Sequence, residues 1–434
     1  MQKIKNIFFK KKILIYGLGK SGYSTFNFLK SRSKIYLYDD NKNSIKSLGI
    51  KKKIINYNNL IKIDFDYIII SPGIDIENCK LSNFIKKNLE KLNTDIDVFY
   101  SIYNKNKNIT ITGTNGKSTT AKILYEVLKD QKFDVRLVGN IGNPILSEKK
   151  IKKNTVFVIE ASSYQLEYSK IFKSNYAVIL NISPDHLERH KTFKNYVRTK
   201  FKLIKNQQNS DNAFLNMKNH YLRNEIKINR IRSKIINVEN KIDNKIVKKI
   251  NNSYFLTDSN IENLSFIIKI SKKLQLNQFK LIKTLQKFKG LNYRQQIIYK
   301  SKYLSIINDS KATSYSSSVA LLKSLSNVHW LVGGIPKLGD RFLLTKKSCR
   351  KVKAYIFGKN KRNFIRELKN KMIFESFKNL KSAIKKIFVD IKKNKTKEHN
   401  VILFSPASAS FDSFKNFEER GKYFNNQIKK QVNA

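Results

Sequence analysis

Short apolar runs alternate with helical stripes and with glycine-rich or polar turns along most of the chain. Residues 13–16, 35–38 and 66–70 have the length of buried strands, and glycine or polar residues follow each of them. A helix is predicted after the first run, through Phe28 and Leu29. Because strands that alternate with helices form parallel sheets covered by helices, about ninety residues at the start predict a small α/β domain.

The same alternation returns twice further along the chain. The additional strands are predicted at 155–159, 176–182, 304–307, 328–332, 354–357 and 401–404. Residues 211–258 are dominated by Asn, Lys and Ile without a clear motif, and we expect divergent strands and loops there. The pattern as a whole predicts an α/β protein with more than one domain.

The composition is typical of a globular protein, and the cysteine count indicates the cellular compartment in which it works. The chain has 434 residues, which is too long for one core, and 41% of them are hydrophobic. Two cysteines, Cys79 and Cys349, give neither a disulfide framework nor a zinc spacing, so we expect a reducing, cytoplasmic environment. The basic start and the short apolar run after it predict neither a signal peptide nor a membrane span.

The formal net charge of +55 at first suggests a nucleic-acid partner, because Lys and Arg neutralise phosphates. However, lysine is spread through every segment together with Ile and Asn, whereas a nucleic-acid site gathers basic and aromatic residues on one element. We therefore expect no specific nucleic acid as a partner. A basic NTPase that binds nucleic acid is the alternative from another class, and DNA-stimulated ATP hydrolysis would test it.

Residues 108–120 (Asn-Ile-Thr-Ile-Thr-Gly-Thr-Asn-Gly-Lys-Ser-Thr-Thr) describe a strand, a glycine loop and a helix start. Loop N–H groups and the helix dipole favour an anion, the Lys117 ammonium can reach outer phosphates, and the Ser118 hydroxyl can bind Mg²⁺. The strict P-loop pattern has a glycine where this chain has Ile111. The motif therefore predicts a shortened P-loop, and a surface turn without a ligand is the plainer alternative.

A second glycine turn, Gly17-Leu18-Gly19-Lys20-Ser21-Gly22, follows the first strand of the chain. The next strand ends in Asp39 and Asp40, which places a carboxylate about twenty residues further on, where it could bind a ribose hydroxyl. Such a turn could bind a dinucleotide or another nucleotide diphosphate, or it could simply pack a helix tightly on a strand.

Polar side chains also end the central strands. Glu160 follows one strand and His186 follows another, and the carboxyl ends of parallel strands face the ligand crevice in α/β sheets. We therefore expect both side chains near the bound nucleotide, with Glu160 as a natural Mg²⁺ ligand. An ordinary solvated glutamate and a surface-loop histidine are the alternatives.

Taken in order, these motifs resemble the Mur ligases over nearly the whole chain. The segments that carry the resemblance are 17–19, 71–74, 113–119, 140–142, 160–167, 185–189, 308–313 and 405–421. The resemblance implies three domains: a Rossmann-like domain that binds the UDP substrate at 1–96, a P-loop ATPase-like domain at 97–290, and a Rossmann-like domain that binds the amino acid at 291–434. Residues 309–313 and 410–417 resemble the branch of the family that adds D-glutamate.

The resemblance implies an ATP-dependent amide ligase of peptidoglycan precursor synthesis that acts as a monomer in the cytoplasm. ATP, with Mg²⁺, would phosphorylate the carboxylate of UDP-N-acetylmuramoyl-L-alanine, and the amine of D-glutamate would displace the phosphate. A folylpolyglutamate synthase or another Mur ligase is the alternative within the class. A folate enzyme would begin near the phosphate loop, without about a hundred residues ahead of it.

Site residues follow from the resemblance position by position. Lys117, His186 and Lys200 are the expected catalytic residues, and Lys200 aligns with a lysine that the family carbamylates. Mg²⁺ would be bound by Ser118, Glu160, His186 and carbamylated Lys200. The expected ATP-binding residues are Gly113, Thr114, Asn115, Gly116, Lys117, Ser118, Thr119, Asn260, Asn263, Arg294 and Asp309.

The two other substrates have their own expected residues. Those for the UDP substrate are Gly19, Lys20, Ser21, Asp39 and Ser71, and those for D-glutamate are Lys311, Thr313, Lys337, Ser410 and Phe417. Asn140 is a further expected substrate-binding residue. Three positions depart from the family pattern: Ser259 stands for histidine, Asn292-Tyr293 for Pro-His, and Asp40-Asn41 for Thr-Arg. These departures concern contacts with adenine and uridine more than the reaction itself.

Overall fold

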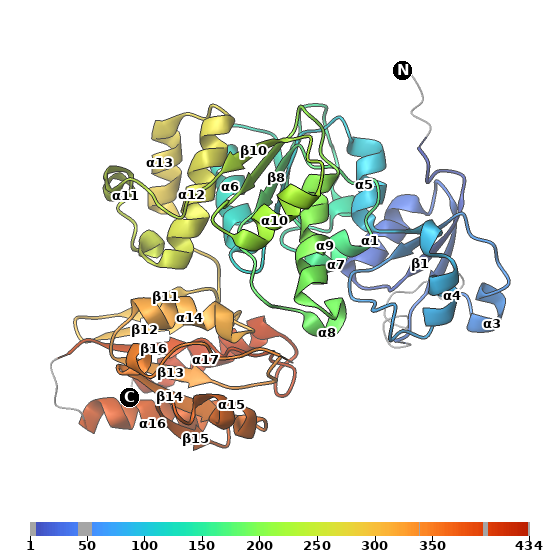
Figure 1. The fold of residues 1–434 in the computed structure, drawn as a ribbon. Helices are drawn as coiled ribbons and strands as arrows, with labels where there is room; N and C mark the ends of the chain where they lie inside the picture. The colour runs from blue at the N-terminus through green and yellow to red at the C-terminus, as the bar shows by residue number, and fades with distance from the viewer. Residues whose placement is uncertain (1–5, 42–53, 338, 394–397, 433–434) are drawn as a thin grey trace. The chain divides into compact units, whose positions relative to one another are not determined.

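The computed structural model describes residues 6–41, 54–337, 339–393 and 398–432 (Figure 1). The chain forms two compact units, each of which is described by itself. The first comprises Met1–Ile182, Thr192–Asp243 and Glu262–Gln286, and the second comprises Ser183–Lys191, Asn244–Ile261 and Lys287–Ala434.

The first unit begins with a parallel sheet of four strands in the order β2-β1-β3-β4. The strands are β1 (Lys12–Tyr16), β2 (Lys34–Tyr38), β3 (Tyr67–Ile70) and β4 (Leu92–Asn93). The helices that follow them are α1 (Lys20–Leu29), α3 (Tyr57–Leu60), α4 (Ser82–Lys87), η2 (Leu89–Lys91) and α5 (Asp95–Tyr103). Ile13 and Ile15 face one core while Leu14 and Tyr16 face another, which explains the unbroken apolar run of β1.

A second sheet in this unit has six parallel strands in the order β10-β9-β8-β5-β7-β6. They are β5 (Asn108–Thr112), β6 (Val135–Gly139), β7 (Val156–Glu160), β8 (Tyr176–Ile179), β9 (Asn212–Leu215) and β10 (Lys234–Asn237). The associated helices are α6 (Lys117–Asp130), η3 (Ile145–Ser147), α7 (Ser163–Glu167), α9 (Phe193–Lys205), α10 (His220–Ile228), α12 (Asp258–Lys273) and α13 (Gln278–Lys287). Helix α6 buries Ile123, Leu124, Val127 and Leu128 on one face.

The prediction that residues 211–258 hold strands and loops is wrong in part. Besides β9 and β10, this segment contains α10, α11 (Asn244–Ile250) and η4 (Ser253–Leu256). Helix α10 begins at a side-chain cap, because Asn219 accepts hydrogen bonds from the N–H groups of Tyr221 and Leu222. It buries only Leu222 and Glu225, so the sequence offers no apolar stripe that would reveal a helix.

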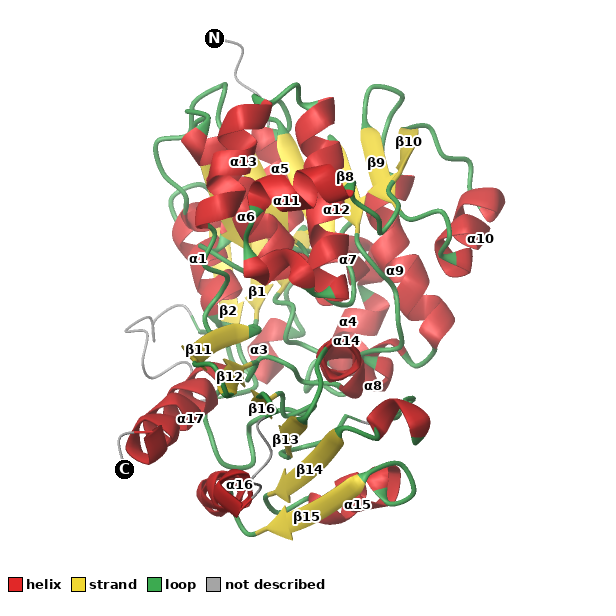
Figure 2. Cartoon of the chain, turned by 90° about the vertical axis from the view of Figure 1, so that its left-hand side faces the viewer, coloured by secondary structure: helices red, strands yellow, loops and turns green. Residues whose placement is uncertain are grey.

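The second unit contains a six-stranded sheet in the order β11-β12-β16-β13-β14-β15, parallel except for the edge strand β11. Its strands are β11 (Gln296–Lys300), β12 (Leu304–Asn308), β13 (Val328–Val332), β14 (Val352–Phe357), β15 (Ile373–Phe377) and β16 (Asn400–Phe404). Helices α14 (Tyr315–Ser324) and α15 (Lys361–Leu368) pack on one face, and α16 (Leu380–Lys393) and α17 (Phe417–Val432) pack on the other (Figure 2). The short helices η5 (Lys347–Cys349) and α8 (Leu187–His190) also belong to this unit.

Candidate active site

The phosphate loop connects β5 to α6 in the first unit. Gly113 and Gly116 have φ angles of 148° and 79°, in a region that side chains other than glycine rarely adopt. Gly116 is the N-cap of α6, and no side chain caps the helix among the described residues. The positive end of the helix dipole lies at this start of α6 and favours an anion.

Ser118, Glu160 and Asn140, which the sequence places far apart, meet beside this loop. The Ser118 hydroxyl donates to one Glu160 carboxylate oxygen at 2.6 Å, and the Asn140 amide donates to the other at 2.8 Å. Ser118 and Glu160 are 2% and 1% exposed, so burial restricts how their oxygens can turn. Mg²⁺ prefers oxygen ligands and usually takes one or two from the protein and the rest from phosphates and water, which this pair fits.

Two lysines lie beside this site in different environments. The Lys117 ammonium donates to the carbonyl oxygens of Gly113 and Thr114, at 2.9 and 2.7 Å, so it lies over the loop itself. Lys200 on α9 is only 1% exposed, and its ammonium lies 3.4 Å from the Thr112 hydroxyl. Of the lysines that the structure describes, Lys200 alone has a buried side chain, whereas lysines are rarely buried unless they are paired.

Asn263, on α12, packs directly against the phosphate loop. A Cβ atom at Gly116 would lie 2.1 Å from Asn263 Oδ1, so a side chain at Gly116 would collide with it. The loop is also held by Asn181, whose Oδ1 accepts the Asn115 N–H at 2.8 Å and whose amide donates to Glu262 at 2.9 Å. Asn181 and Glu262 were missed by sequence reasoning, because in an Asn-rich chain nothing marks one asparagine above another.

The first glycine turn connects β1 to α1 and is held by side chains from other strands. The Leu18 N–H donates to Asp39 Oδ2 at 2.6 Å, and the Ser71 hydroxyl donates to the Gly17 carbonyl at 2.7 Å. A Cβ atom at Gly22 would lie 1.8 Å from that same carbonyl, so α1 approaches the turn too closely for any side chain. Gly19 and Lys20 are exposed and Ser21 is half-buried at the start of α1.

In the second unit, Asp309 lies at the end of β12, where the sequence predicts a nucleotide contact. Its two oxygens accept hydrogen bonds from the Gln295 N–H at 3.1 Å and the Ser405 hydroxyl at 2.9 Å. Burial raises the pKa of Asp309 to about 7, and the nearby Arg294 charge offsets part of that rise. Asn260 belongs to the same group, because its amide donates to Gln295 at 3.0 Å.

His186 and Lys337 also meet within the second unit. The Lys337 ammonium lies 2.5 Å from Asp185 Oδ1, and the His186 ring nitrogens lie 3.4 Å from Asp185 and 3.3 Å from Glu188. His186 has a φ angle of 56°, an uncommon conformation that starts α8. The hydrogen bond from His186 keeps the pKa of Glu188 below its usual range.

Of the residues expected to bind D-glutamate, four lie on loops that follow β12, β13 and β16, and Phe417 is the first residue of α17. The Lys311 ammonium sits 3.9 Å from the centre of the Phe417 ring, which is a cation–π contact. Thr313 is half-buried and Ser410 is 3% exposed. Arg420 was missed as a site residue: its guanidinium donates to the carbonyls of Ser310 and Ser408, at 2.7 and 3.0 Å, and so joins two of these loops.

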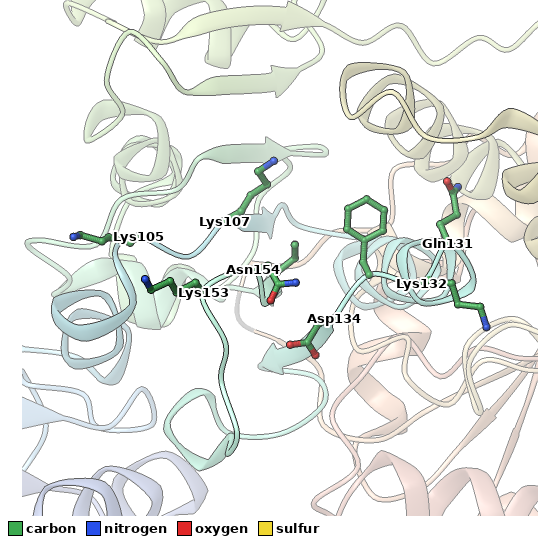
Figure 3. A pocket seen from close by; sticks show the side chains of 9 residues that line it. Lys105, Lys107, Gln131, Lys132, Asp134, Lys153 and Asn154 are labelled. Carbon is green, nitrogen blue, oxygen red and sulfur yellow. The ribbon is translucent and has the colours of Figure 1, made fainter. Parts of the chain in front are cut away.

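A pocket of about 580 Å³ lies at the amino ends of the strands of the central sheet, at the end of the sheet away from the phosphate loop (Figure 3). Figure 3 shows Lys105 and Lys153 on one side of it and Gln131 and Lys132 on the other. It lies beside the amino ends of β5, β6 and β7 and the carboxyl end of α6, where the helix dipole disfavours anions. Ligands of open α/β sheets bind at the other edge, so this pocket is not the nucleotide site.

Comparison with known proteins agrees with this arrangement. Residues 11–92 match the N-terminal domain of MurD-like Mur ligases, and residues 111–282 match the Mur ligase middle domain. Two UDP-N-acetylmuramoylalanine–D-glutamate ligases are similar over almost their full lengths: that of Rickettsia bellii is 33% identical, covering 96% of both chains, and that of Rickettsia prowazekii is 34% identical, covering 96% of this chain and 98% of the relative. The chain belongs to the Mur ligase family. The resemblance seen in the motifs is thereby confirmed.

Solved structures show that this Mur ligase shares the family fold. MurF ligase from Thermotoga maritima in complex with ADP aligns with a TM-score of 0.57 at 16% identity, covering 86% of this chain and 91% of MurF. MurC from the same organism aligns with a TM-score of 0.53 at 16% identity, covering 97% and 99%. Within the described residues, no helix is both long and apolar enough to span a membrane.

Proposed function

We propose that this Mur ligase adds D-glutamate to UDP-N-acetylmuramoyl-L-alanine, with hydrolysis of ATP, in peptidoglycan precursor synthesis. The relatives similar over 96% of the chain carry this activity in their names. The observation that carries the proposal is the pair of hydrogen bonds that brings Ser118 and Asn140 onto Glu160 beside the phosphate loop. A buried carboxylate and hydroxyl beside a phosphate loop fit a nucleotide triphosphate and its metal. The match of residues 11–92 to the N-terminal domain of MurD-like ligases favours this proposal over a folate enzyme.

The chemistry follows from the weakness of a carboxylate as an electrophile. The terminal phosphoryl group passes from ATP to the carboxylate of the alanine arm, which gives an acyl phosphate and ADP. The amine of D-glutamate then attacks the acyl carbon, and the tetrahedral intermediate collapses to the amide as phosphate leaves. Phosphoryl transfer of this kind needs mainly positioning and neutralisation of charge, which the loop N–H groups and Lys117 can supply.

The ATP site in this proposal is built from the residues of the phosphate loop. Lys117 moves from the loop carbonyls to the outer phosphates, because those oxygens carry full charge and the carbonyls do not. Mg²⁺ neutralises phosphate charge when bound, and Ser118 and Glu160 hold it. Carbamylated Lys200 and His186 complete the proposed metal ligands, and Asn260, Asn263, Arg294 and Asp309 serve the adenosine.

The remaining candidate residues bind the other two substrates in this proposal. The diphosphate and uridine of the UDP substrate lie along Gly19, Lys20, Ser21, Asp39 and Ser71, and Asn140 orients the alanine arm. The two carboxylates of D-glutamate pair with Lys311 and Lys337. Lys311 then leaves the Phe417 ring and Lys337 leaves Asp185, the partners that they contact in this structure. Thr313, Ser410 and Phe417 line the same subsite. The proposed enzyme is a cytoplasmic monomer.

The test is phosphate release from ATP in the presence of UDP-N-acetylmuramoyl-L-alanine with D-glutamate, L-glutamate or no amino acid. We expect release only with D-glutamate, together with a product whose mass equals that of both substrates less one water. Release with a different amino acid would move the chain to another branch of the family. Release that requires a folate or DNA would overturn the proposal.

A further inference from the structure

A row of polar side chains follows neighbouring strands of the central sheet and leads to the phosphate loop. Asn240 and Asn216 follow β10 and β9, and Asn181 follows β8, which pairs with β5. Glu262 on α12 joins them: its Oε1 accepts the Asn240 amide at 3.0 Å and its Oε2 accepts the Asn181 amide at 2.9 Å. The Asn216 amide donates to Asn240 Oδ1 at 3.2 Å. All four residues belong to the first unit.

Asn181 holds the phosphate loop at two successive residues. Its carbonyl oxygen accepts the Thr114 N–H at 2.9 Å, and its Oδ1 accepts the Asn115 N–H at 2.8 Å. The Asn181 amide also donates to the Asn115 carbonyl at 3.4 Å. The contact is close, because a Cβ atom at Gly113 would lie 3.3 Å from the Asn181 nitrogen. The course of the loop before Gly116 therefore depends on Asn181.

Hydrogen-bond directions show how Glu262 orients the Asn181 side chain. An ionised carboxylate can only accept, so the amide nitrogen of Asn181 must face Glu262 and its oxygen is left for the Asn115 N–H. The reversed orientation would set oxygen against oxygen and N–H against N–H, and both hydrogen bonds would be lost. Burial raises the pKa of Glu262, and the amides of Asn181 and Asn240 oppose that rise because they favour the ionised form.

We propose that Glu262 is a positioning residue for the nucleotide: it orients Asn181, and Asn181 holds the phosphate loop in the shape that receives the phosphates of ATP. This inference rests on the proposed function, which places ATP at this loop. Asn263, the next residue of α12, packs against Gly116, so α12 supports the loop at a second point. A loop that is held before the ligand arrives loses less conformational freedom on binding, which strengthens binding.

The experiment exchanges donor and acceptor between the two side chains and measures the dissociation constant of Mg²⁺–ADP by calorimetric titration of the full-length protein. Asn181→Asp keeps the shape and the acceptor for Asn115, but it sets a second carboxylate against Glu262. We expect this constant to rise about 10- to 100-fold. Glu262→Gln can still accept from Asn181 while the exposed Asn240 turns, so its loss should be less than about fivefold.

The double variant provides the decisive comparison. When Asn181→Asp is combined with Glu262→Gln, the new glutamine amide can donate to the new aspartate, and binding should return to within about fivefold of Glu262→Gln alone. Asn181→Asp combined with Glu239→Gln is the matched control. Glu239 is an exposed carboxylate 3.7 Å from the Lys218 ammonium, so its loss removes the same charge without supplying the hydrogen bond. We expect no recovery in this control.

Initial rates distinguish positioning from a general loss of stability. Asn181→Asp should raise the KM for ATP and leave the KM for the UDP substrate unchanged. A protein that is only less stable would have fewer active molecules, so kcat would fall and both KM values would stay as they are. That second result would overturn the positioning role.

The remaining outcomes also separate this inference from the proposed function. Binding of Mg²⁺–ADP by Asn181→Asp within about threefold of the wild type, or equal recovery with Glu239→Gln, would overturn the role of Glu262. If Asn181→Asp does not fold, Glu262→Ala decides: we expect binding at least about fivefold weaker, and an unchanged constant would overturn the inference. A wild type that binds Mg²⁺–ADP but releases no phosphate with D-glutamate would overturn the proposed function instead.

Discussion

The first unit contains the same local device twice, a strand that breaks into a glycine turn and continues as a helix. At Gly17 and at Gly113 the backbone has a positive φ angle, and α1 and α6 both begin at a glycine with no side-chain cap among the described residues. The surroundings differ. The first turn is held by Asp39 and Ser71 through backbone atoms, whereas the second has Lys117, Ser118 and Glu160 within its own contacts.

This difference separates holding a phosphate from transferring one. N–H groups at a helix start are enough to bind an anion, and the first turn offers little more than these and Ser21. Transfer also requires a cation and metal ligands that meet the developing charge, and the second turn has a buried carboxylate and hydroxyl already paired. The two turns should therefore respond to substitution in different kinetic constants.

The largest loss of activity should come from Lys117→Ala, because this substitution takes from the second turn the cation that phosphoryl transfer requires. We expect kcat/KM to fall about 10²–10³-fold, because the ammonium stabilises charge that appears only in transfer. Phosphate release measures the loss, and circular dichroism should show an unchanged fold. Lys122→Ala, on the same helix and paired with Glu126, is the control. Activity within threefold of the wild type would contradict a phosphate role for Lys117.

A somewhat smaller loss of activity is expected for Lys200→Ala. This substitution tests whether metal binding is a further difference between the second turn and the first. Removal of a carbamate ligand should lower activity on the order of 100-fold. Acetate or formate should restore part of it by entering the vacated space as an anion. Lys194→Ala, exposed on the same helix, should keep full activity.

Carbon-13 bicarbonate offers an independent check on Lys200. A carbamate carbon signal that appears in the wild type and disappears in Lys200→Ala would support the modification. A loss of activity that no carboxylic acid restores, without such a signal, would leave Lys200 as a buried cation.

The smallest effect belongs to Ser71→Ala at the first turn. The substitution removes one hydrogen bond, to the Gly17 carbonyl, which is worth roughly 0.5–1.5 kcal/mol. We expect the KM for the UDP substrate to rise about two- to tenfold while kcat and the KM for ATP stay unchanged. Initial rates over a matrix of both substrates would show this. A fall in kcat would mean that the first turn also takes part in the chemistry.

Local order could be predicted well from the sequence because it depends on neighbours along the chain. The strands at 13–16, 328–332 and 401–404 are confirmed within a residue or so, and α6 follows its apolar stripe. The helices α10 and α11 were not predicted, since each buries few side chains and their Lys- and Asn-rich segments resemble loops. The edge strand β11 and the strand β15 also lack a strong period-two pattern.

The sequence by itself determined the two glycine turns, the polar residues at strand ends and, through the order of its motifs, the family. These features are local, because a positive φ angle demands glycine and a helix start binds anions wherever it lies. Only the tertiary structure decided which lysine among so many is buried and that Glu160 receives both Ser118 and Asn140. Burial and pairing depend on segments distant in sequence, and in a chain with 87 basic residues no single lysine is distinguished until packing excludes water from it.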